Sequence, residues 1–270
     1  MRPFGTKHHR FARLCSAAIV IAGCALPAAA QQRSQIARPG PIPGDLTPRV
    51  QLFQCGDFQG HFGPLDYRKA HKDDRRLVES WHFDAELSMF LRGQLRGRTK
   101  AGTTNATSGF QYTLKALPNH PVALKVMEEA ARKMGSEQPS SDYPMECWYL
   151  RAFMIAPDDP VVRAMYGVYL AHRDRPQEAR HNLDLADRDL RQSRTMQFII
   201  AEARLALRDY EGAQINGMRS ARLGFKTDAL EKELRAAGKW NEALTLPPDD
   251  AVVQSPAPAS ATSPASAASN

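Results

Sequence analysis

Residues 161–190 read VVRAMYGVYLAHRDRPQEARHNLDLADRDL, and this pattern predicts two helices joined by a short turn. Apolar residues recur at helical spacing over residues 161–170, and Gly167 leaves room there for a partner helix to approach. The residues Asp-Arg-Pro at 174–176 interrupt the pattern, because proline cannot continue a helix. A second helix follows, and three small or apolar residues mark one of its faces: Ala179, Leu183 and Ala186. The unit is about 34 residues long, a length typical of helical repeats.

The same frame recurs 34 residues further along the chain, where Ala213 takes the position of Ala179. The first face of this second unit is formed by Phe198, Ile200, Ala201 and Leu205, and its turn by Arg208, Asp209 and Tyr210. One frame before the first unit, the corresponding positions hold Met145, Ala152 and Pro157. A shortened unit at the end of the array contains Leu230, Leu234, residues 238–240 and Ala243. The spacing therefore predicts consecutive helical hairpins, and we expect residues 122–243 to be helical throughout.

The units resemble the tetratricopeptide repeat (TPR) over residues 120–245. The resemblance is carried by Gly167, Ala179, Leu183 and Ala186 in one unit and by Ala201, Tyr210 and Ala213 in the next. It is degenerate, because the aromatic residue usual early in the first helix is replaced by Arg163 and Gln197. The resemblance implies an all-α, TPR-like α-solenoid of three to four hairpins, which stack because each one alone leaves an apolar face exposed to water. The alternative is an unrelated helical bundle with accidental spacing.

Residues 48–118 do not follow the repeat, and we interpret them as an irregular, partly helical extension that packs on the repeat domain, residues 119–246. Short helices are expected at residues 85–91 and 110–117, separated by a mobile loop over residues 100–109 that is rich in Gly and Thr. Pro118 should end one helix, and Asn119 should cap the next one, over residues 122–134. Together with Glu146-Cys147 and residues 238–240, the extension resembles a group of exported bacterial TPR proteins without an established activity or ligand.

Residues 1–30 have the features of a cleaved signal peptide. Four basic residues precede an apolar stretch over residues 14–26, and Pro27 and three alanines follow it. The stretch is shorter than the ~20 residues that a helix needs to cross a bilayer, so we expect cleavage after Ala30 and export to the periplasm. The alternative is an outer-membrane lipoprotein, because residues 21–24, Ile-Ala-Gly-Cys, match the site at which bacterial lipoproteins are cut and acylated, here on Cys24.

The composition of the chain ends and the charge limit the possible partners. We expect a flexible lead-in at residues 31–47 and a disordered tail rich in Ala, Ser and Pro at residues 247–270. Removal of the leader subtracts four basic residues from the formal charge of +7 and leaves +3. In the remainder, acidic and basic residues alternate, whereas a nucleic-acid interface needs basic residues clustered without carboxylates. The sequence therefore indicates no nucleic-acid partner, and a membrane contact only if Cys24 is lipidated.

No pattern of residues predicts catalysis, a cofactor or a metal site. The histidines outside the leader lack the short spacing of metal ligands, and the chain has no Cys-x-x-Cys motif. Ser80 and His82 lack the strained turn that exposes a nucleophilic serine. The first hypothesis is therefore a non-enzymatic scaffold in the cell envelope that binds a protein or peptide on its concave surface. One rival is an enzyme or small-ligand binder with a pocket between the extension and the repeats, lined by Glu79, His82, Tyr112 or His120. The other is a lipid-anchored assembly factor for a surface machine.

Two cysteines remain after cleavage at Ala30, Cys55 in the extension and Cys147 in a repeat helix. Export would place them in an oxidising compartment, where an even pair of thiols tends to be bridged. We therefore expect one disulfide between them, and the alternative is two independent buried thiols.

Overall fold

The computed structural model describes residues 34–59, 62–99 and 102–246, and over these residues the all-α fold is confirmed. The predictions for the signal peptide, Cys24 and the tail lie outside the described residues. The only strands in the described part are β1 (Arg96–Thr99) and β2 (Gly102–Asn105), which pair in antiparallel register. The helices are the 3₁₀ helix η1 (Leu52–Cys55), α1 (Lys72–His82), α2 (Asp84–Leu91), α3 (Ala106–Ala116), α4 (Pro121–Met134), α5 (Met145–Ile155), α6 (Pro160–Ala171), α7 (Pro176–Asp189), α8 (Arg194–Ala206), α9 (Tyr210–Arg222) and α10 (Ala229–Ala236).

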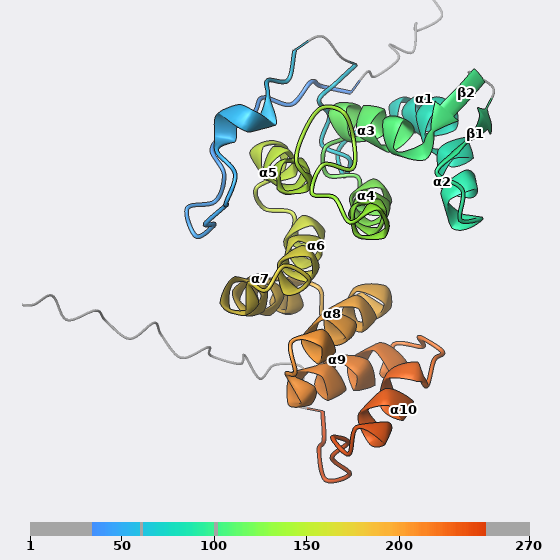
Figure 1. The fold of residues 1–270 in the computed structure, drawn as a ribbon. Helices are drawn as coiled ribbons and strands as arrows, with labels where there is room; N and C mark the ends of the chain where they lie inside the picture. The colour runs from blue at the N-terminus through green and yellow to red at the C-terminus, as the bar shows by residue number, and fades with distance from the viewer. Residues whose placement is uncertain (1–33, 60–61, 100–101, 247–270) are drawn as a thin grey trace, which may run out of the picture. The chain divides into compact units, whose positions relative to one another are not determined.

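Two helical hairpins, α6/α7 and α8/α9, form the most extensive helix pairs (Figure 1). Helix α6 also contacts α4 on one side and α8 on the other, so the first helices of successive hairpins are neighbours. Helices α1, α2 and α3 pack on one another, and α3 packs on α4. One apolar cluster runs through these elements from Phe83 to Leu207. None of the described helices is both long and apolar enough to traverse a lipid bilayer.

Small residues allow the hairpins to close. A methyl group built on Gly167 of α6 would lie 2.8 Å from Cγ of Leu183 on α7. A larger residue than glycine at this position would therefore displace the leucine side chain. The predicted packing residues Ala179, Leu183 and Ala186 are fully buried on α7. Ala201 on α8 and Ala213 on α9 are also fully buried. Neighbouring parts of the chain therefore pack directly against each of these side chains.

Prolines and short polar side chains determine where the helices begin. Pro160 and Pro176 are the first residues of α6 and α7, where the missing N–H of proline is not needed. Asp159 caps α6 by accepting a hydrogen bond from Val161 N at 3.0 Å. The prediction that Asn119 caps α4 is wrong, because the Nδ1 atom of His120 accepts from Ala123 N at 3.1 Å instead. Asn119 is engaged elsewhere, with its Nδ2 donating to a carboxylate oxygen of Asp66 at 2.8 Å.

Three segments differ from the expectation. The mobile loop predicted over residues 100–109 is replaced by strand β2 and the first turn of α3, which Asn105 caps by accepting from Thr107 N at 3.2 Å. Helix α1 was not predicted from the sequence. The expectation of helix up to residue 243 is also wrong, because α10 ends at Ala236 and Gly238 follows in the left-handed region, with φ of 65°.

Residues 34–58, which we call the strap, are irregular apart from η1, with a turn at residues 44–45 and a bend at residues 49–50. The sequence predicted a flexible lead-in over residues 31–47, but residues 34–47 are held to the helical part of the chain. Ser34 N donates to Asp74 at 2.9 Å, and Gly40 N donates to Met154 O at 2.7 Å. Hydrogen bonds of this kind are made by main-chain atoms. A segment rich in Pro and Gly therefore gives little sign of them in its composition.

Candidate functional site

A buried histidine at the start of α4 contacts a carboxylate of α1. The Nε2 atom of His120 lies 3.2 Å from Oε1 of Glu79, and the same oxygen accepts a hydrogen bond from the Tyr67 hydroxyl at 3.1 Å. Because Nδ1 of His120 accepts from Ala123 N, the ring proton of the neutral form sits on Nε2 and is donated to Glu79. Burial lowers the pKa of His120, although the neighbouring Glu79 acts in the opposite direction.

A second pair from the same hypothetical pocket lies on α1 and α3. The rings of His82 and Tyr112 are stacked, with centroids 3.6 Å apart. Burial lowers the pKa of His82, while Glu86 opposes this shift. The four side chains of the rival hypothesis therefore gather as two contact pairs, Glu79 with His120 and His82 with Tyr112.

The imidazole of His120 is hydrogen-bonded at both nitrogens, to Ala123 N and to Glu79. Ser80 donates its hydroxyl to Leu77 O of its own helix at 3.4 Å, so no nucleophile–base pair forms with His82. The cluster joins α1 to the start of α4.

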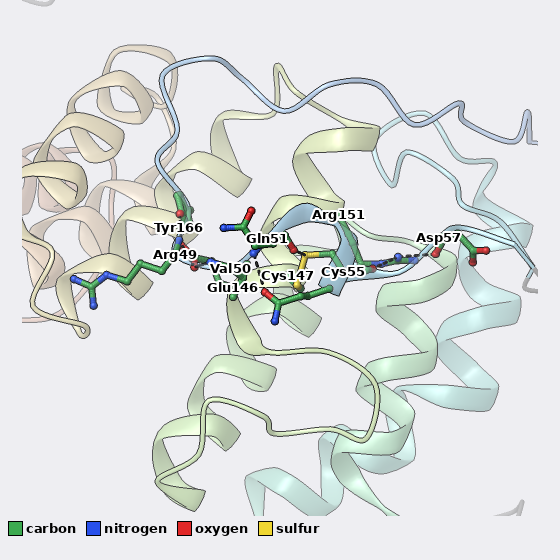
Figure 2. The surroundings of a disulfide bond; sticks show 10 residues. Arg49, Val50, Gln51, Cys55, Asp57, Glu146, Cys147, Arg151 and Tyr166 are labelled. Atoms are coloured by element: carbon green, nitrogen blue, oxygen red, sulfur yellow. Dashed lines mark hydrogen bonds between the residues drawn. A yellow bond between two sulfur atoms is a disulfide. The ribbon is translucent and has the colours of Figure 1, made fainter.

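The two cysteines outside the predicted leader are brought together, as predicted (Figure 2). The Sγ atoms of Cys55 and Cys147 lie 2.10 Å apart, the distance of a disulfide, and join η1 to α5 across 92 residues. Both residues are fully buried.

Arg151, one turn after Cys147 on α5, holds the end of the strap. Its Nη1 donates to the carbonyl oxygens of Cys55 at 2.8 Å and Asp57 at 2.7 Å. The guanidinium lies against the rings of Phe58 and Tyr143, at 4.0 and 4.8 Å from their centroids. Burial lowers the pKa of Arg151. Two carbonyls and two aromatic faces therefore compensate part of this buried charge, while Nε and Nη2 have no hydrogen-bond partner among the described residues.

A buried ion pair lies beside the disulfide, between Glu146 of α5 and Arg175 at the start of α7. Oε1 of Glu146 accepts from Arg175 Nη1 at 2.5 Å and from the Tyr166 hydroxyl at 2.7 Å. Oε2 accepts from the main-chain N–H groups of Arg49 and Val50 at 3.0 and 3.2 Å (Figure 2). The side chains of Glu146 and Arg175 are only 3% and 2% exposed, so this pair is a buried part of the fold.

Sequence reasoning missed this pair. It singled out Glu146 beside Cys147 without assigning it a role, and it treated Arg175 only as part of the break between two helices. One sequence feature could have indicated the buried arginine. Arg175 directly precedes the proline that begins α7, and a guanidinium at this position can pack beneath the turn.

We use the name charged face for four charged residues of α4, α8 and α10: Lys125, Glu129, Glu202 and Glu233. Lys125 and Glu129 form an ion pair. Burial raises the pKa of the Glu202 carboxyl, Lys125 opposes this shift and Glu233 adds to it. A small hollow of about 90 Å³ lies at the α8–α10 end. It is lined by Phe198, Met218, Phe225, Leu230 and Trp240, and the rings of Phe198 and Phe225 stack at 4.6 Å.

The described residues contain no group of three or more His, Cys, Asp or Glu side chains placed to hold a metal ion. Comparison of the chain with protein-family models, with curated proteins and with solved structures gives no match.

Proposed function

We propose that this chain is a TPR-like scaffold that binds a protein or peptide on the charged face. The observation that carries the proposal is the stacking of the helical hairpins α6/α7 and α8/α9 beside α4. Helix α6 contacts both α4 and α8, so the first helices of the hairpins follow one another along this side. In helical repeat arrays such a succession of helices provides a binding surface.

The chemistry of the face suits a peptide with both polar groups and one apolar anchor. Lys125 and Glu129 pair with each other but are 47% and 24% exposed, so a ligand can exchange its own charged groups into this pair. The exposed Glu202 can accept hydrogen bonds. The hollow around Phe198 and Trp240 has room for one apolar side chain, and aromatic pockets of this kind are common anchoring points in interfaces.

We further propose that the protein acts in the periplasm or cell envelope, free after cleavage at Ala30 or anchored through Cys24. The close approach of Cys55 and Cys147 supports export, because disulfides persist in oxidising compartments and are rare in the cytosol. We do not propose an enzymatic role for the Glu79–His120 cluster, since both nitrogens of the imidazole are engaged.

The test is site-specific cross-linking in cells that produce the full chain. A photoreactive residue replacing Lys125 or Glu202 should capture one specific protein, whereas the same residue at the exposed position Arg188 of α7 should not. The charge reversals Lys125→Glu and Glu202→Lys should each reduce capture from the other position at least tenfold, with Arg188→Glu as the matched control. Equal capture from all three positions, or no effect of the reversals, would contradict the proposal.

A further inference from the structure

Side chains of the helical part hold the strap through its main chain. Arg175 Nη2 donates to the carbonyl oxygen of Thr47 at 2.6 Å. Oε2 of Glu146 accepts from the next two free amides, those of Arg49 and Val50, which reach one oxygen because the chain bends at residues 49–50. The residue between, Pro48, has no N–H to donate. One carbonyl and two amides of the strap are thus bound in succession.

Three neighbouring side chains of the strap supply specific contacts. Asp45 accepts from Arg163 Nη1 of α6 at 2.7 Å and lies 2.8 Å from Nε2 of His181 of α7. Leu46 is 8% exposed and belongs to the main apolar cluster. Thr47 donates its hydroxyl to Glu178 at 2.5 Å. The bound motif is therefore an acidic residue in a turn, followed by a leucine and a hydroxyl residue.

The helix side chains that bind the strap also form hydrogen bonds and ion pairs with one another. Arg175 and Glu146 pair with each other, and Tyr166 and Glu178 hold them in place. If the strap leaves, Oε2 of Glu146 loses both of its main-chain donors, whereas Nη2 of Arg175 loses the Thr47 carbonyl and keeps Glu178. The site therefore favours a segment that restores the hydrogen bonds to Glu146.

The attachment of the strap allows it to leave. The covalent link is at Cys55, after the recognised residues, and it leaves residues 34–50 tied only by non-covalent contacts. Within that segment Leu46 is the only residue that is buried, and Ile42 and Val50 are partly buried against the core. Because the strap is tethered, a competing segment faces an effective concentration of about 1 mM, which masks the site until the strap is weakened.

We propose that Glu146, Arg163, Arg175 and His181 form a second peptide-recognition site, occupied in cis by residues 45–50 of the strap, and that it takes an acidic–Leu–Thr segment of a partner protein in the same bent conformation when the strap is displaced. This site lies on α5, α6 and α7 and is separate from the charged face, so it does not rest on the function proposed above.

The test uses the full chain with its disulfide intact and a fluorescent peptide of residues 43–52, PGDLTPRVQL. The receptor is either the wild-type chain or the double variant Asp45→Ala/Leu46→Ala, in which the strap is weakened. Hydrogen exchange of the Arg49 and Val50 amides reports detachment of the strap, and fluorescence anisotropy reports peptide binding. We expect these amides to exchange at least tenfold faster in the double variant, and the peptide to bind it at least tenfold more tightly than wild type.

Specificity is tested on both sides of the interface. A peptide with alanine at the positions of Asp45 and Leu46 should bind at least tenfold more weakly. His181→Ala in the double variant should also weaken binding, and its half-exposed side chain makes this change safe for folding. Arg163→Ala provides the second receptor variant. The proposal is overturned if the strap detaches and the peptide still does not bind, if both peptides bind equally, or if the strap amides of the double variant stay as protected as in wild type.

Discussion

Replacing Cys55 and Cys147 by serine should strongly destabilise the fold. The bond closes a loop of 92 residues. In the chain-entropy model, a loop of this length removes denatured-state entropy worth about 4–5 kcal/mol at 25 °C. The folded state of the variant keeps the bonds from Arg151 to the Cys55 and Asp57 carbonyls, so the loss should arise mainly in the unfolded chain. For a chain of this size, that corresponds to a fall in Tm of about 10–15 °C.

The assay combines urea unfolding with peptide mapping of protein purified from the envelope. The Cys55→Ser/Cys147→Ser variant should unfold at lower urea, and a reductant should destabilise wild type but leave the variant unchanged, which serves as the control. Non-reducing digestion should yield one linked peptide containing both cysteines. Quantitative alkylation of both thiols without reductant, or identical unfolding of wild type and variant, would refute the reasoning.

Three further changes test the packing, the buried ion pair and the buried histidine. Ala179→Leu overpacks a closed helix crossing and should cost about 1–3 kcal/mol in urea unfolding; a wild-type melting curve would mean that the crossing is loose. Glu146→Gln leaves Arg175 without its buried charged partner and should cost about 3–5 kcal/mol, whereas Glu178→Gln, at the more exposed partner of the same arginine, should cost about 0–1 kcal/mol. Equal losses would show that burial of the pair does not matter. Burial lowers the pKa of His120 in the folded state, so its neutral form stabilises the fold above the unfolded pKa of about 6.5, and this contribution is lost as the pH falls toward the lower folded value. Unfolding measured at pH 7 and pH 5 should therefore show a larger loss for wild type than for His120→Asn, which keeps a capping side chain; parallel losses would contradict the assignment.

The sequence predicted the helices whose signals are local. Pro160 and Pro176 begin α6 and α7, and the spacing of apolar and small residues after them shows which face is buried. These signals act within one or two turns of helix, so they can be recognised without the tertiary structure. The cysteine pair was also predictable, because with two cysteines left after the predicted cleavage there is only one possible intramolecular pairing.

Predictions from local sequence patterns were wrong where a polar side chain could hydrogen-bond to a distant residue as well as to its own helix. Asn119 is a good helix cap, yet Asp66 and Tyr67, more than 50 residues earlier, take its amide and its oxygen, and His120 caps α4 instead. Residues 100–109 have the composition of a loop, yet Asn105 caps α3. Both outcomes depend on which distant group is in hydrogen-bonding distance, and periodicity contains no information about that.

The sequence by itself determined the helical class, the hairpin spacing and the cysteine pair, because these follow from short-range sterics, burial periodicity and the number of cysteines. Only the tertiary structure decided the course of the strap and the partners of its main chain. Arg175 and Thr47 are 128 residues apart in sequence, and Glu146 and Val50 are 96 apart. Main-chain amides and carbonyls are the same in every residue apart from the missing N–H of proline, so the sequence cannot specify which of them a buried side chain will bind until the helices have packed.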